Sequence, residues 1–178
     1  MKLTKVEIEA FRSIRKCQTL HIDPTVTVLI GANDHGKTNL LEAIRCLNSD
    51  RPFTEKDKNW DTDDPSKVKA SYYFTLDPDE ITRIVGMLEA EHRKPPADGA
   101  KPADETRTET VFNAPSDLEK WILVRSGVGG RYAWIEPAGV FKDKAIVDFI
   151  NSRLPRVELF EPVASNIKDS ISLIESAS

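Results

Sequence analysis

Alternation of apolar and polar residues dominates the start of the chain and predicts three strands. The first two are predicted over residues 3–11 and 17–22, where apolar side chains recur at a spacing typical of strands. The third, over residues 25–30, follows the turn-forming pair Asp23-Pro24 and is mostly β-branched. Such a run is typical of a strand buried on both faces, so we expect it at the centre of a sheet.

A helical period replaces this alternation at Lys37. Leu40, Ile44 and Leu47 recur at the spacing that places side chains on one helix face. The glycine-containing stretch 31–36 separates this predicted helix from the third strand. Residues 1–48 are therefore interpreted as a core made of strands, a loop and a helix.

Residues 67–178 predict a β-subdomain with additional helices. Its clearest element is a helix over residues 78–91, because Asp77 provides an N-cap and Pro78 suits the first helical position. The other expected elements are strands at 68–76, 121–125, 131–135 and 157–160, a turn at 126–130, and helices at 145–150 and 167–174.

Two long polar stretches connect these elements. Residues 49–66 predict a surface loop, and residues 93–110, with three prolines and many charges, predict a mobile loop. Too little chain follows the second stretch to form a separate core, so residues 1–178 are interpreted as one domain.

The composition narrows the class of protein. A hydrophobic content of 39% in 178 residues can bury an ordinary core, which excludes disorder of the whole chain. No apolar run reaches the roughly 18 residues of a membrane helix, and no signal peptide is recognisable, so we expect a soluble cytoplasmic protein. Cys17 and Cys46 lack the spacing of a zinc site or a disulfide framework. With a net charge of −4, any nucleic-acid contact has to come from a local basic patch.

The segment from Gly31 to Thr38, GANDHGKT, matches the phosphate-binding pattern G-x-x-x-x-G-K-S/T. It follows a predicted strand and opens a predicted helix, a placement that lets backbone N–H groups surround a phosphate at a helix N-terminus. In this interpretation Lys37 bridges the β- and γ-phosphates of ATP, and the Thr38 hydroxyl binds Mg²⁺. The alternative is a glycine loop that joins a strand to a helix and carries an incidental lysine.

The residues around this loop resemble the N-terminus of ATPases of the RecF, SMC and OLD (overcoming lysogenization defect) group. In that group a strand ends in a phenylalanine, a basic residue and a small residue, and the phosphate loop continues into an Asn-hydrophobic-hydrophobic-Glu-Ala helix. The matching residues here are Phe11, Arg12, Ser13, Gly31, Asn33, Gly36, Lys37, Thr38, Asn39, Leu40, Leu41, Glu42 and Ala43. The pair Asn33-Asp34 is most similar to OLD-like nucleases and related anti-phage ATPases.

The resemblance implies an α/β P-loop NTPase fold, the N-terminal lobe of an ABC-type head, with a mixed sheet and an antiparallel β-subdomain. It implies ATP and Mg²⁺ as ligands and a homo-oligomer formed through the heads. DNA and a nuclease or effector are candidate partners. The implied nucleotide-binding residues are Arg12, Gly31, Asn33, Asp34, His35, Gly36, Lys37, Thr38 and Asn39, with Thr38 as the metal ligand. For Arg12 the alternative is a basic residue that only ends a strand, and His35 is expected to face solvent or an opposing subunit.

The chain departs from this family in the parts that hydrolysis needs, so the catalytic residues stay unassigned. The family's Walker B acids, signature loop and glutamine are not recognisable after the phosphate loop. Asp148 follows apolar residues as a Walker B acid does, but these residues have helical spacing. Residues 126–130 are rich in glycine, but they fit a hairpin turn better than a signature loop. Four acidic residues are candidates for a metal or water contact: Asp57, Asp61, Asp63 and Asp64. The simpler interpretation is that they form a solvated acidic loop.

We therefore expect the first lobe of a longer ATPase whose hydrolysis, in the assembled head, serves DNA repair or anti-phage defence. The alternative is a scaffold that binds ATP without turning it over and docks a nuclease or an effector. A P-loop kinase or small GTPase is disfavoured because the chain has no NKxD motif. Trp60, Trp121 and Trp134 are too scattered in sequence to predict a base-stacking platform.

Overall fold

A computed structural model describes residues 1–32, 36–92, 118–137 and 140–159. The elements, in chain order, are β1 (Lys2–Glu9), β2 (Gln18–His21), α1 (Lys37–Arg45), the 3-10 helix η1 (Glu55–Asp57), β3 (Lys69–Thr75), α2 (Pro78–His92), β4 (Lys120–Ser126), β5 (Tyr132–Glu136), the 3-10 helix η3 (Val140–Lys142) and α3 (Lys144–Ser152). The first two predicted strands, the helix after the phosphate loop, the strand at 68–76, the hairpin around residues 126–130 and the helices at 78–91 and 145–150 are confirmed.

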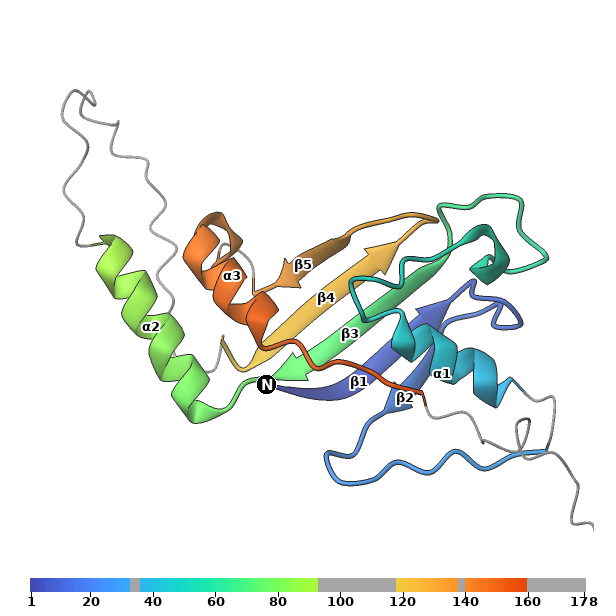
Figure 1. Cartoon of the computed structure of the whole chain (residues 1–178), viewed down its shortest axis with the longest axis horizontal. Helices are drawn as coiled ribbons and strands as arrows, with labels where there is room; N and C mark the ends of the chain where they lie inside the picture. The colour runs from blue at the N-terminus through green and yellow to red at the C-terminus, as the bar shows by residue number, and fades with distance from the viewer. Residues whose placement is uncertain (33–35, 93–117, 138–139, 160–178) are drawn as a thin grey trace, which may run out of the picture.

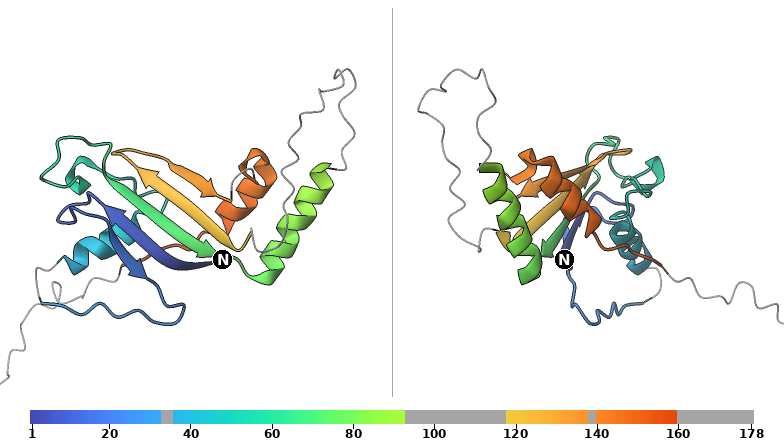
Figure 2. Two further views of the ribbon diagram at one scale, coloured as in Figure 1. Left: turned by 180° about the vertical axis from the view of Figure 1, so that it is seen from behind. Right: turned by 60° about the vertical axis from the view of Figure 1, so that its left-hand side comes forward.

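The five strands form one sheet in the order β2-β1-β3-β4-β5, and every pairing in the described part of the chain is antiparallel. α1 lies across one face of this sheet, and α2 and α3 lie together at the end that holds the N-terminus (Figure 1). Seen from behind, the opposite face of the sheet carries no described helix (Figure 2). One antiparallel sheet therefore joins β1 and β2 of the predicted core to β3, β4 and β5 of the predicted β-subdomain.

The core lies between the sheet and α1, and its residues follow directly from strand and helix periodicity. Ile8, Tyr72 and Trp121 are completely buried on the face that α1 covers, because alternate side chains of a strand point to the same side. Ala43 and Ile44 contribute the buried face of α1. The sheet and α1 therefore form one packed unit, which holds the start of α1 in a fixed place.

The prediction of a central strand over residues 25–30 is wrong. This segment pairs with no described strand, and the side chains of Val26, Val28 and Ile30 are 68%, 70% and 92% exposed. Asp23 directs the backbone away from β2, because its carboxylate accepts hydrogen bonds from two following backbone N–H groups at 2.8 and 3.1 Å. A β-branched apolar run is buried only when partner strands flank it, and the described residues supply none.

The stretch 49–66 is only partly the surface loop that its polarity predicts. Phe53, Asp57 and Asn59 are buried in it, with exposed fractions of 1%, 6% and 4%. Polar residues are buried here because each has a hydrogen-bond partner in the fold, a condition that composition does not reveal.

At the C-terminal side, residues 157–159 form no strand, although one was predicted over 157–160. Val157 is instead held by the Asn48 side chain, which accepts from its N–H and donates to its carbonyl at 2.9 and 2.7 Å. The predicted loop at 93–110 and the helix at 167–174 lie outside the described residues.

The reactivity of the two cysteine thiols tests whether the core is packed as described. Cys17 is exposed and Cys46 is buried, and burial, followed by the nearby Asp57 carboxylate, raises the pKa of the Cys46 thiol to about 11. At pH 8 this thiol is protonated as well as covered, so we expect Ellman's reagent to modify one thiol rapidly and the second only after unfolding in urea. Cys17→Ser should remove the rapid phase. Rapid modification of both thiols in the native chain would contradict the packing described.

Candidate phosphate-binding site

The candidate phosphate loop ends where α1 begins, and the structure requires glycine at that point. Gly36 is the N-cap of α1 and has a φ of 81°, a left-handed conformation that glycine adopts without strain. A Cβ atom here would also lie 3.2 Å from the hydroxyl oxygen of Ser13. No acidic side chain lies in the first turn of α1, so the positive end of the helix dipole is available to an anion.

Lys37 and Thr38 lie where the phosphate-loop interpretation places them. The Lys37 ammonium folds over the loop and donates to the carbonyl oxygens of Gly31 and Ala32, both at 2.6 Å. Thr38 is exposed in the first turn of α1, and among the described residues its hydroxyl has no hydrogen-bond partner. A cation held over a glycine loop and a free hydroxyl at a helix N-terminus fit a nucleotide phosphate and its Mg²⁺.

The middle of the loop is not part of the described structure. Asn33, Asp34 and His35 lie outside the described residues, so their predicted roles in nucleotide binding stay predictions. Gly31, Gly36 and the residues that open α1 are described, and these carry the geometry of the site.

Arg12 lies beside the loop and contacts another predicted nucleotide-binding residue. Its Nη1 atom donates to Oδ1 of Asn39 at 3.4 Å, and Nδ2 of Asn39 donates to the Ser13 hydroxyl at 2.8 Å. Arg12 has a φ of 46°, a left-handed conformation that is uncommon for a residue with a side chain. The structure thus brings the end of β1 and the first turn of α1 together at the phosphate loop.

A buried carboxylate holds the Arg12 guanidinium in place. Oδ1 of Asp57 accepts from Nε and Nη2 of Arg12 at 3.0 and 2.8 Å. Oδ2 of Asp57 accepts from the backbone N–H and the hydroxyl of Thr54 at 2.9 and 2.8 Å. Because both oxygens are engaged and the residue is buried, Asp57 fixes Arg12 rather than contacting a metal ion or a water.

The acidic loop residues thus divide into two groups. Asp61, Asp63 and Asp64 are exposed and fit the interpretation of a solvated loop. At the surface, Asp61 is bound to Arg15 and Asp64 to Ser66. Asp57 does not fit this interpretation, because it is buried in the Arg12 contact. In the described part of the chain, no group of three or more histidine, cysteine or acidic side chains could hold a metal ion. No helix described in the structure is both long and apolar enough to cross a bilayer.

α1 and the segment that follows it are fastened to the sheet through backbone carbonyl groups. The Tyr72 hydroxyl donates to the Ala43 carbonyl oxygen at 2.9 Å, and burial raises the pKa of Tyr72 well above its usual value, which keeps this donor protonated. Arg125, 2% exposed, donates to the carbonyl oxygens of Asn48 and Arg51 at 3.3 and 2.8 Å. These contacts hold α1, and with it the phosphate loop, against the sheet.

Sequence reasoning missed the roles of Asp57 and Arg125. The Asp57 contact joins residues 45 positions apart and leaves no local signal. Arg125 did leave a local signal. A cation that ends the apolar run WILVR is expected to be buried, and it then needs buried hydrogen-bond acceptors.

The phosphate loop at the start of α1, packed on a five-stranded sheet, defines a P-loop nucleotide-binding protein of the α/β class. A family model described as an AAA ATPase domain matches residues 1–150. The chain therefore belongs to this family of ATPases. Asp148, the imitation of a Walker B acid, is an exposed residue of α3 and is not part of the site.

Two RecF proteins are examples of the relatives that this chain resembles in sequence. The chain is 48% identical over 44 residues to the DNA replication and repair protein RecF of Acidothermus cellulolyticus, an alignment that covers 25% of the chain and 12% of that protein. It is 45% identical over 53 residues to RecF of Shewanella sp. strain W3-18-1, covering 30% of the chain and 14% of that protein. The chain thus matches only 12–14% of the length of these relatives.

A solved SMC ATPase, described in connection with ATP-driven dimerization and DNA-stimulated activation, has the same fold. It superimposes with a TM-score of 0.52 at 16% identity, covering 96% of this chain and 93% of the other. The expected N-terminal lobe of a RecF- or SMC-like P-loop ATPase is therefore confirmed. The nearer resemblance to OLD-like ATPases stays a prediction.

Proposed function

We propose that this chain is an ATP-binding lobe in which the α1 N-terminus holds the nucleotide phosphates. The observation that carries the proposal is the position of Lys37, whose ammonium lies over a glycine loop at a helix N-terminus with no acidic side chain in its first turn. We assign nucleotide contacts to Arg12, Gly31, Asn33, Asp34, His35, Gly36, Lys37, Thr38 and Asn39. Thr38 would also hold Mg²⁺, which would neutralise charge between the phosphates.

Replacing Lys37 tests this proposal. Lys37→Ala removes the cation over the loop, so we expect Mg²⁺·ATP affinity to fall about 10- to 100-fold, as for the loss of a charge-assisted hydrogen bond. Isothermal titration calorimetry measures the change, and Lys120→Ala, at the start of β4, is the matched control. Equal ATP affinity in wild type and Lys37→Ala would remove the phosphate-loop assignment.

In the complete protein, we propose that hydrolysis is coupled to dimerization of the ATPase heads and serves DNA repair or anti-phage defence in the cytoplasm. The names of the RecF relatives and the dimerization described for the SMC ATPase support a role with DNA. The exposed side chains of Val26, Val28 and Ile30 support a head in which further strands cover residues 25–30. A nuclease or effector partner is part of the proposal for defence.

A scaffold that binds ATP without turnover is the second candidate. One observation favours it, namely that Asp57, the buried acid beside the site, is fully engaged with Arg12 and Thr54. Sustained hydrolysis by the complete protein would exclude this candidate.

A further inference from the structure

Arg12 is held beside the phosphate loop by its backbone as well as by its side chain. Its N–H donates to the Asp57 carbonyl oxygen at 2.8 Å, and its own carbonyl oxygen accepts from the side-chain amide of Asn59. Both partners are buried. These contacts hold Arg12 in its left-handed conformation, which costs free energy for a residue with a side chain. The structure therefore fixes the point from which the Arg12 side chain extends.

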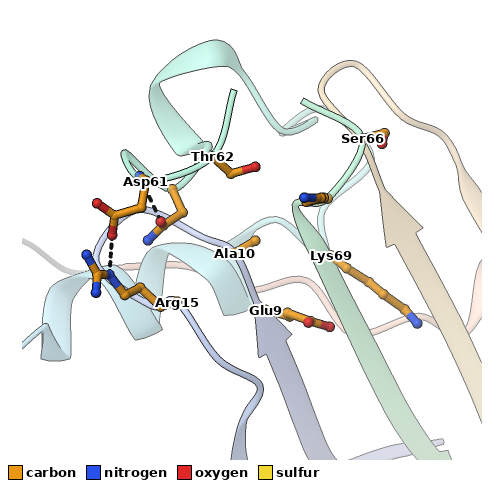
Figure 3. Close-up of a pocket in the computed structure, with 9 residues that line it drawn as sticks. Glu9, Ala10, Arg15, Asp61, Thr62, Ser66 and Lys69 are labelled. Atoms are coloured by element: carbon orange, nitrogen blue, oxygen red, sulfur yellow. Dashed lines mark hydrogen bonds and ion pairs between the residues drawn. The ribbon is translucent and has the colours of Figure 1, made fainter. Parts of the chain in front are cut away.

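The segment around Asn59 is fastened to the residues that follow β1. The N–H of Asn59 donates to the Ala10 carbonyl oxygen at 2.9 Å. In the wall of a surface cavity, the Asp61 N–H donates to Oδ1 of Asn59 at 3.0 Å, and the Asp61 carboxylate is paired with Arg15 (Figure 3). The segment that supports Arg12 is therefore ordered by contacts of its own.

Asp57 covers only part of the Arg12 guanidinium. Oδ1 of Asp57 lies 3.0 Å from Nε and 2.8 Å from Nη2, and Nη1 contacts the Asn39 side chain. A guanidinium carries five N–H groups, so at least two of them have no partner among the described residues. The side chain of Arg12 is 29% exposed and that of Asp57 is 8% exposed. An anionic ligand can therefore reach the arginine but not the carboxylate.

Asp57 uses both of its oxygen atoms as acceptors. While Oδ1 faces Arg12, Oδ2 accepts from the backbone N–H and the hydroxyl of Thr54. An asparagine has a single acceptor oxygen and would turn its NH2 group towards one of these two sets of donors. The carboxylate also balances the guanidinium charge, and a charge-assisted contact of this kind fixes both partners. The position of the Arg12 side chain therefore depends on a carboxylate at this place.

We propose that Asp57 is a positioning residue for ATP, which holds Arg12 so that its free N–H groups meet a nucleotide phosphate. This role rests on the proposed contact between Arg12 and ATP. A side chain that is ordered before the ligand arrives loses little entropy on binding, and the guanidinium fork pairs well with phosphate oxygens. The Asp57 charge repels phosphate, but the Arg12 cation 2.8 Å away offsets that charge, so the gain from ordering dominates.

A double-mutant cycle tests the proposal, with Mg²⁺·ATP affinity measured by isothermal titration calorimetry on the full chain. In the wild-type background, Asp57→Asn should weaken ATP binding about 2- to 10-fold, the cost of ordering one long side chain. In the Arg12→Ala background the same change should not weaken binding, because no guanidinium is left to position. Asp61→Asn is the matched control, because it removes the same charge from the ion pair with Arg15, and it should not weaken binding.

A second measurement needs no ATP and stays informative if Asp57→Asn fails to fold. In the NMR spectrum of the wild-type chain without nucleotide, the Arg12 Nε–H signal is assigned by its loss in Arg12→Lys. We expect this hydrogen to exchange with water at least about 10-fold more slowly than the Nε–H of the exposed Arg131, because it is bonded to a buried carboxylate.

Four outcomes would each overturn the positioning role of Asp57. They are unchanged affinity in a folded Asp57→Asn variant, equal weakening by Asp57→Asn with and without Arg12, equal weakening in the Asp61→Asn control, and fast exchange of the Arg12 Nε–H. Unchanged affinity in Arg12→Ala would remove this role while leaving ATP binding at Lys37 intact. The proposed ATP site itself fails by a different result, namely unchanged affinity in Lys37→Ala.

Discussion

The 178-residue chain alone is expected to bind ATP but to hydrolyse it at least about 100-fold more slowly than the assembled ATPase. Phosphoryl transfer needs a positioned water, a metal ion with several ligands, and charge stabilisation as the bond breaks. Loss of one group that stabilises the transition state typically costs about 100- to 1,000-fold in rate. The described residues supply a phosphate cradle and one metal ligand, Thr38.

Three of the acidic residues that could orient a water are engaged or distant. Asp57 is held by Arg12 and Thr54, and Asp61 is paired with Arg15. Asp148 lies on α3, at the end of the sheet opposite the start of α1 (Figures 1 and 2). We therefore expect the water-orienting group to come from another part of the head.

Phosphate release by the purified chain measures this prediction, with Lys37→Ala as the control for contaminating ATPases. Hydrolysis should appear when the remaining lobe is supplied. Steady hydrolysis by the chain alone, abolished by Lys37→Ala, would contradict the prediction. It would then point to Asp61 or Asp148 as part of the active site.

The sequence predicted best those parts of the fold whose signals are local. The helix α2 follows from Asp77 and Pro78, and the start of α1 follows from the change of period at Lys37 next to a glycine loop. Both signals lie within a few residues of the feature that they predict. The same holds for Lys37 and Thr38, because one motif specifies both their spacing and their place at a helix N-terminus.

The sequence failed where a partner distant along the chain decides the outcome. Residues 25–30 have the composition of a central strand, but burial of such a strand depends on neighbours that the described residues do not supply. Asp57 belongs to a stretch whose polarity predicts a surface loop. Its buried contact leaves no local signal, because its partner Arg12 lies 45 residues away.

Replacing Arg125 by alanine is expected to lower the free energy of unfolding by about 2–5 kcal/mol. The substitution leaves the Arg51 carbonyl oxygen without the Arg125 donor, and an unsatisfied polar group away from water costs about 1–3 kcal/mol. The Asn48 carbonyl oxygen loses one of two donors, because the Arg51 N–H still donates to it at 3.1 Å. Arg125→Ala also removes the guanidinium that stacks 4.0 Å from the Tyr132 ring, which leaves unfilled space in the core. The substitution also removes a buried charge whose Nε atom has no hydrogen-bond partner among the described residues. The losses exceed this relief, because alanine neither fills the space nor replaces the donor to Arg51.

Urea denaturation followed by circular dichroism measures this change. Arg131→Ala is the matched control, because Arg131 is exposed beside the same hairpin and should alter stability by no more than about 0.5 kcal/mol. Arg125→Met fills more of the space but leaves the Arg51 carbonyl oxygen without its donor, so its loss of stability should lie between those of Arg125→Ala and Arg131→Ala. A loss below about 1 kcal/mol in Arg125→Ala would show that water reaches the segment after α1 and satisfies the Arg51 carbonyl oxygen, against the burial of Arg125.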